Sequence, residues 1–135
     1  MKRKRLKGLF PCGVAAVGFG ALGLVSRFWL QAFYLFAWTA RHSYLFLWAG
    51  ALVLGLLGYG ILSYSITAGN AAGVVIGQFL GDLLAARGER KVLPDMKPDM
   101  VERLTSHRGV LIWLVTVAAF FVGGMVIYRK RRAGE

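Results

Sequence analysis

The sequence predicts an all-α integral membrane protein: a bundle of four, or alternatively three, transmembrane helices with a short aromatic helix at the interface. The 135-residue chain is 57% hydrophobic and only 17% charged, whereas soluble domains are about a quarter charged. Its charged residues gather at the two ends and in one loop. Residues 43–81 form a run of 39 residues without Lys, Arg, Asp, Glu or His. A helix needs about 20 apolar residues to cross a bilayer, so this run has the length of two crossings.

The chain begins with a basic tail, residues 1–7, which contains five Lys or Arg residues. Eighteen uncharged residues, 8–25, follow, and together with Ser26 they predict a first span over 8–26. A secretory signal peptide is the alternative, because it also combines a basic start with an apolar segment. We favour an uncleaved span, since the apolar run exceeds the 7–15 residues typical of signal peptides and no clean cleavage site follows it. Basic residues favour the cytoplasmic side, which predicts a cytoplasmic N-terminus in the cell membrane.

An aromatic segment, residues 27–42, follows the first span. Its uncharged part, residues 28–40, has 13 residues and is short for a crossing. Six of these are Phe, Tyr or Trp, and Trp and Tyr favour the boundary between lipid and water. We therefore expect an interfacial helix here.

The long uncharged run is expected to supply two helices. Residues 43–66 predict the second span, and the Thr-Ala-Gly-Asn stretch at 67–70 is the most turn-like part of the run. Residues 68–86 then form the third span, or a re-entrant or interfacial segment if the protein has three spans.

A glycine stripe lies within residues 68–86. Its members recur every four residues and would share one face of a helix. Small residues allow membrane helices to approach closely, so the stripe predicts a helix-packing face, within the protein or between copies. The glycine stripe consists of Gly69, Gly73, Gly77 and Gly81.

Three polar residues accompany the stripe and form a possible polar track: Asn70, Gln78 and Asp82. Carboxylates within a membrane are expensive and often mark proton or ion paths. The alternative places Asp82 at the interface as an anchor of the helix end, or paired with Arg87. We favour this alternative because Asp82 lies about five residues from the charged loop.

The remaining sequence is a polar loop over 87–108, a span over 109–128 and a basic tail over 129–135. The loop contains six basic and four acidic residues, and Pro94 and Pro98 oppose a continuous helix. Four spans place nine basic residues inside and eight outside, whereas three spans place 11 inside and six outside. The count favours three spans. The length of the uncharged run and the dense basic tail favour four, which we adopt.

Several function classes lack support in the sequence. The net charge of +11 fits anionic lipid head groups, and no motif points to nucleic acid. One cysteine excludes an internal disulfide. His42 and His107 have no spacing typical of metal ligands. We therefore expect no metal, no cofactor and no enzymatic activity.

Two functions fit the remaining features. The first is a non-enzymatic accessory or helix-packing subunit of a larger membrane complex, with the glycine stripe as its docking face. The alternative is a small homo-oligomeric transporter or channel, including a lysis-type pore, lined by the polar track. The expected partners are membrane lipids and either further copies of the chain or a larger membrane protein.

Overall fold

The structure, a computed structural model, describes residues 2–42 and 44–134, without the side chains of residues 2–8 and 40. Within these residues all regular secondary structure is helical, as the sequence predicts. The six helices are α1 (Lys2–Phe28), α2 (Tyr34–His42), α3 (Leu45–Leu56), α4 (Gly60–Glu89), α5 (Pro98–Thr105) and α6 (Gly109–Ala133).

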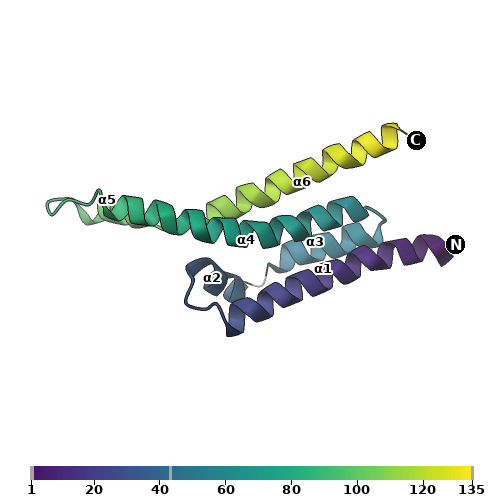
Figure 1. Cartoon of the computed structure of the whole chain (residues 1–135), viewed down its shortest axis with the longest axis horizontal. Coiled ribbons are helices and arrows are strands. Elements are labelled where there is room, and N and C mark those ends of the chain that lie inside the picture. The colour runs from purple at the N-terminus through teal and green to yellow at the C-terminus, as the bar shows by residue number, and fades with distance from the viewer. Residues whose placement is uncertain (1, 43, 135) are drawn as a thin grey trace.

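Four of the helices run along one long axis, each antiparallel to the next: α1, α3, α4 and α6 (Figure 1). The start of α1, the α3–α4 turn and the end of α6 lie at one end of the molecule, whereas α2 and α5 lie toward the other. The 30-residue α4 is central, because it packs against each of the other five helices and most extensively against α6.

Three helices are long and apolar enough to cross a membrane: α1, α4 and α6. The fourth member of the bundle, α3, is apolar but has only 12 residues. At 1.5 Å per residue it extends about 18 Å, against a hydrocarbon core of about 30 Å. The single helix expected over residues 43–66 is wrong in its bounds, since α3 ends at Leu56 and α4 begins at Gly60. The chain nevertheless returns along α3 to the end of the molecule where α1 begins (Figure 1). The three-span alternative predicted a re-entrant or interfacial segment at residues 68–86. These residues instead lie within the long helix α4.

The turn expected at residues 67–70 is also wrong, because the chain breaks ten residues earlier. Gly58 has φ +85°, the left-handed conformation that glycine adopts readily after a helix end. Its N–H donates to the carbonyl of Gly55 at 3.1 Å, and the N–H of Tyr59 donates to Leu54 at 2.8 Å. This pair of bonds is the Schellman arrangement, which satisfies the last carbonyls of α3.

The other helix boundaries lie closer to those that the sequence predicts. Both basic tails continue helices, since α1 begins at Lys2 and α6 runs to Ala133; residue 1 and the side chains of 2–8 lie outside the described part. The predicted loop over 87–108 contains α5, which Pro98 begins. Proline fits this place because the first N–H of a helix has no intrahelical partner.

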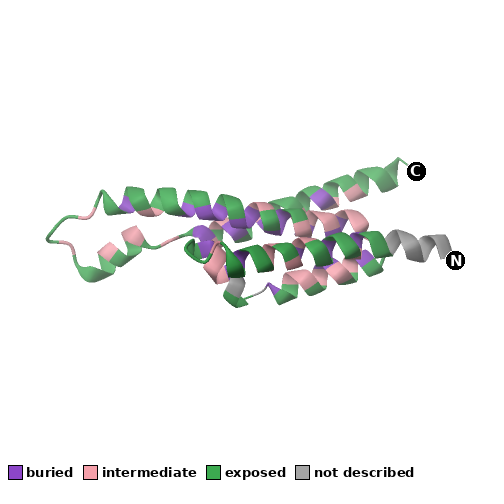
Figure 2. Ribbon diagram, turned by 60° about the horizontal axis from the view of Figure 1, so that its bottom comes forward, coloured by how far each residue is buried: buried purple, intermediate pink, exposed green. Residues whose placement is uncertain are grey.

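The core lies where α4 meets its neighbours. Buried residues follow the inward faces of the long helices, and the outward faces are exposed (Figure 2). Many exposed residues on α1, α4 and α6 are large and apolar; Val17 and Phe79, for example, are 71% and 72% exposed. An apolar outer surface of this extent is expected of helices that face lipid.

Candidate functional site

The glycine stripe lies at the contact between α4 and α6, and all four glycines are buried. A methyl group added at Gly69 would lie 2.8 Å from Cβ of Phe120. One added at Gly73 would lie 2.9 Å from Cδ1 of Trp113. Real Cβ atoms essentially never approach other atoms this closely, so the helices can pack at this distance only with glycine at these positions.

Farther along the stripe, the backbone of α4 contacts the backbone of α6 directly, at Gly77 and Gly109. A methyl group at Gly77 would lie 2.6 Å from the carbonyl oxygen of Gly109, and one at Gly81 would overlap the ring of His107. The reverse also holds, because a methyl group at Gly109 would lie 2.8 Å from the carbonyl oxygen of Gly77. The partner of the stripe is therefore this chain's own α6. A docking face for another protein at the stripe is excluded because α6 already occupies it.

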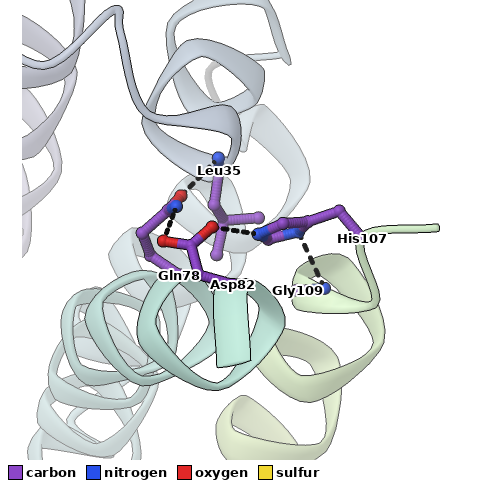
Figure 3. Close-up of polar contacts among 5 residues, drawn as sticks. All are labelled: Leu35, Gln78, Asp82, His107 and Gly109. Atoms are coloured by element: carbon purple, nitrogen blue, oxygen red, sulfur yellow. Dashed lines mark hydrogen bonds and ion pairs between the residues drawn. The ribbon is translucent and has the colours of Figure 1, made fainter. Parts of the chain in front are cut away.

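Two of the three residues of the predicted polar track meet in one cluster, together with His107 (Figure 3). Nε2 of Gln78 donates to Oδ2 of Asp82 at 2.8 Å, and Oδ1 of Asp82 lies 3.1 Å from Nε2 of His107. Gln78 is buried, the His107 side chain is 13% exposed and the Asp82 side chain is 53% exposed. The carboxylate is thus open to its surroundings on one side.

The Gln78–Asp82–His107 cluster binds the first turns of two helices. The N–H of Leu35, second residue of α2, donates to Oε1 of Gln78 at 2.7 Å. The N–H of Gly109, first residue of α6, donates to Nδ1 of His107 at 3.1 Å. The first N–H groups of a helix have no intrahelical acceptor, so side chains held from outside satisfy them here (Figure 3).

Asp82 orients both of these side chains. Because Nδ1 of His107 accepts from Gly109, the contacts fit the neutral imidazole with its proton on Nε2, which then donates to Asp82. The carboxylate also lies near the starts of α2 and α6, where helix dipoles favour negative charge. The geometry of Asp82 is therefore that of an anchor that joins α2, α4 and α6. The predicted pairing of Asp82 with Arg87 is absent from the described contacts, in which the carboxylate instead meets Gln78 and His107.

Asn70 lies apart from this cluster. Its Oδ1 accepts from Nε1 of Trp113 at 2.9 Å, and both side chains are buried. Val74, fully buried, lies four residues from Asn70 and four from Gln78 on the same face of α4. The polar track is therefore interrupted within this chain: the structure joins Gln78 and Asp82 but separates them from Asn70.

Aromatic rings pack beside the cluster and around Trp113. Tyr34 lies against His107 with ring centroids 4.4 Å apart, and Tyr44 stacks on Trp113 at 4.7 Å. The hydroxyls of Tyr44 and Thr39 are 2.6 Å apart, and Thr39 donates to the carbonyl of Leu35 at 2.8 Å. These contacts place α2 against the bundle, with Leu35 and Thr39 buried. The interfacial position predicted for residues 27–42 stays a prediction.

Sequence reasoning missed the roles of His107 and Trp113. In the sequence, His107 has no spacing typical of a metal ligand, and no motif around it indicates another role. The available signal was its position two residues before the start of α6, from which a side chain can reach the free N–H groups. His42 behaves differently: its Nδ1 lies 2.9 Å from the carbonyl of Trp38, on whose ring it stacks.

Among residues 2–42 and 44–134, no group of three His, Cys, Asp or Glu residues lies close enough to hold a metal ion. The described hydrogen bonds bring no hydroxyl or thiol to His107 or Asp82. The arrangement can hold one proton between the imidazole and the carboxylate, and it can fix three helices to one another.

No protein-family model, curated protein or solved structure matches this chain.

Proposed function

We propose that this protein is a non-enzymatic accessory subunit that packs against a helix of a larger membrane protein, and that the outer face of α1 is its docking face. In this proposal the chain is a multi-pass protein of the cell membrane. The N-terminus and the C-terminus lie in the cytoplasm, and the basic tails contact anionic head groups.

The observation that carries the proposal is a second set of small residues, on α1, that its own chain leaves open. Methyl groups added at Gly13, Gly20 or Gly23 would have no atom within 4 Å. Ala16 is exposed between them. Their spacing of three, four and three residues places these four residues on one side of the helix. We call them the α1 face.

The contrast with the glycine stripe supports a missing partner. Membrane helices associate through small residues that allow close approach, because lipid provides no hydrophobic drive for it. On α4 such residues are covered by α6, but on α1 they are open. An open apolar hollow of about 770 Å³ adjoins the α1 face at Gly13, and Phe10 and Val17 also line it. A neighbouring helix could insert its larger side chains there.

Native mass spectrometry of gently extracted protein, at its natural expression level, tests the proposal. The wild type should carry a different, larger membrane protein in a fixed ratio. Gly13→Leu combined with Gly20→Leu should abolish this association, because the added side chains keep the partner helix away. Gly123→Leu is the matched control, because it adds the same side chain at an equally open position on α6. A wild type that is monodisperse alone would contradict the proposal.

One observation favours the second candidate, a homo-oligomeric transporter or channel, including a lysis-type pore. Asp82 is half-exposed and hydrogen-bonded to both Gln78 and His107, as an ion-binding carboxylate at a contact between copies could be. This candidate predicts a clean homo-oligomer and flux in liposomes that Asp82→Asn alters. Asp95→Asn, in the exposed segment between α4 and α5, is the control and should leave the flux unchanged.

A further inference from the structure

A cavity of about 580 Å³ lies between the start of α4 and the end of α6, at the end of the molecule that carries the basic C-terminal segment. We call it the α4–α6 cavity. The axis of helix α6 diverges from that of α4 toward this end (Figure 1). The cavity is lined by Leu62, Met125, Tyr128, Arg129, Arg132 and Ala133.

The lining divides into an apolar wall and a cationic rim. Leu62 is buried and Met125 is half-buried, whereas Arg129 and Arg132 are exposed. The two arginines are three residues apart and therefore share a side of α6. The guanidinium of Arg132 lies 5.3 Å from the ring centroid of Tyr128, an aromatic contact that orients it beside the cavity.

Position along α6 places this rim at the depth of lipid phosphates. Arg129 is the first charged residue after the 20 uncharged residues from Gly109 to Tyr128. At 1.5 Å per residue these extend about 30 Å, the thickness of the hydrocarbon core. The arginine guanidinium binds phosphate in bidentate geometry, with two N–H groups that donate to two phosphate oxygens. Within the described part of the chain, neither Arg129 nor Arg132 pairs with a carboxylate.

We propose that the α4–α6 cavity binds one anionic glycerophospholipid, with its phosphate on Arg129 and Arg132 and an acyl chain along Leu62 and Met125. A free phosphate ion offers the same oxygens to the arginines but would leave the apolar wall without a partner. The lipid therefore fits both parts of the lining. The volume also lies within the usual range of ligand sites, about 300–1,000 Å³.

The chain offers a matched control for charge. Lys130 and Arg131 belong to the same turn of α6 but do not line the cavity. Both double substitutions, Arg129→Gln with Arg132→Gln and Lys130→Gln with Arg131→Gln, remove two positive charges at the same end of the helix. Only the first should weaken binding at the site, by about tenfold or more, the scale expected when charge-assisted hydrogen bonds are lost.

The experiment is native mass spectrometry of the full chain, exchanged into detergent with phosphatidylglycerol or phosphatidylcholine. The wild type should retain one phosphatidylglycerol, and the Arg129/Arg132 variant should lose it while the Lys130/Arg131 variant keeps it. Met125→Trp should also release the lipid, because the larger side chain fills the cavity without changing charge. Circular dichroism should show that all variants keep their helix content, and Met125→Phe replaces the Trp variant if that content falls.

Three results would overturn the proposal. Equal losses in the two charge variants would mean general attraction of basic residues to anionic lipid. Retention of lipid in a folded Met125 variant would mean that the apolar wall takes no part. Displacement of the lipid by inorganic phosphate, but not by chloride at equal ionic strength, would mean that the arginines bind a free ion.

Discussion

Gly77 gives the sharpest test of the contact between α4 and α6. In Gly77→Ala the new methyl group would lie 2.6 Å from the carbonyl oxygen of Gly109 and 2.7 Å from Cδ2 of Leu35. An ordinary van der Waals contact begins near 3.4 Å. Since interiors are close-packed, α6 would have to retreat by about 0.8 Å, the difference between 3.4 and 2.6 Å.

The expected change in the free energy of unfolding is the sum of two opposing effects. Alanine is favoured over glycine in a helix by about 1 kcal/mol. Overpacking of a filled contact opposes this by about 1–3 kcal/mol. The control is Gly123→Ala, on the open side of α6, where the methyl group meets no atom within 4 Å. Both variants gain the same helix preference, so Gly77→Ala should be less stable than Gly123→Ala by about 1–3 kcal/mol.

The assay is unfolding of the purified protein in mixed micelles with rising fractions of sodium dodecyl sulfate, followed by circular dichroism. Gly77→Ala should unfold at a clearly lower fraction than Gly123→Ala. Identical midpoints for the two variants would refute the reasoning, because the methyl group at residue 77 would then have found space that the structure does not provide.

Three further predictions concern the polar contacts. Gln78→Leu leaves the N–H of Leu35 without its acceptor, and should lower stability by about 1–3 kcal/mol and speed hydrogen exchange at that amide. Trp113→Phe leaves the buried side-chain carbonyl of Asn70 without its donor and should lower stability by a similar amount. Adding Asn70→Leu should restore part of that stability, because the unpaired carbonyl is then removed. If the double variant is no more stable than Trp113→Phe, the hydrogen bond between the two side chains is contradicted. His107→Ala removes the acceptor for the N–H of Gly109 at the start of α6 and should lower the free energy of unfolding by about 1 kcal/mol, as the loss of a helix cap does. Faster hydrogen exchange of the amides in the first turn of α6 would support this.

The sequence allowed the helical class and the start of the last helix at Gly109 to be predicted, because these follow from local rules. Uncharged runs must satisfy their backbone groups by forming helices, and glycines four apart share a face. The partner of the stripe could not be predicted in this way. Contacts such as that of Gly77 with Gly109 join residues 32 positions apart, and their spacing leaves no mark in a single sequence.

The misplaced break between α3 and α4 has a physical explanation. Polar residues at 67–70 suggested a turn, but Thr67 donates to the carbonyl of Ser63 at 2.9 Å within the helix. Asn70 finds its partner across the helix contact, in Trp113. Both polar side chains therefore make hydrogen bonds while the backbone stays helical. The break falls at Gly58 instead, one of several glycines in the apolar run, and the sequence did not distinguish the one that adopts a positive φ.

The cluster around Asp82 was predictable in part. Gln78 and Asp82 lie one helical turn apart, so their contact followed from spacing. The involvement of His107 and of the N–H of Leu35 depends on how α2 and α6 meet α4, which is a tertiary property. Together these contacts give Asp82 the geometry of an anchor between helices, while one side of its carboxylate stays exposed.

Site-specific photo-crosslinking in the native membrane tests the central claim most directly, namely that the α1 face packs against another membrane protein. A photoreactive phenylalanine derivative would replace Val17, which is exposed beside this face, or Leu114, which is 55% exposed on α6. The account predicts that position 17 crosslinks to a different, larger membrane protein and that position 114 does not. Crosslinks from position 17 to lipid alone, or to a second copy of this chain, would contradict it.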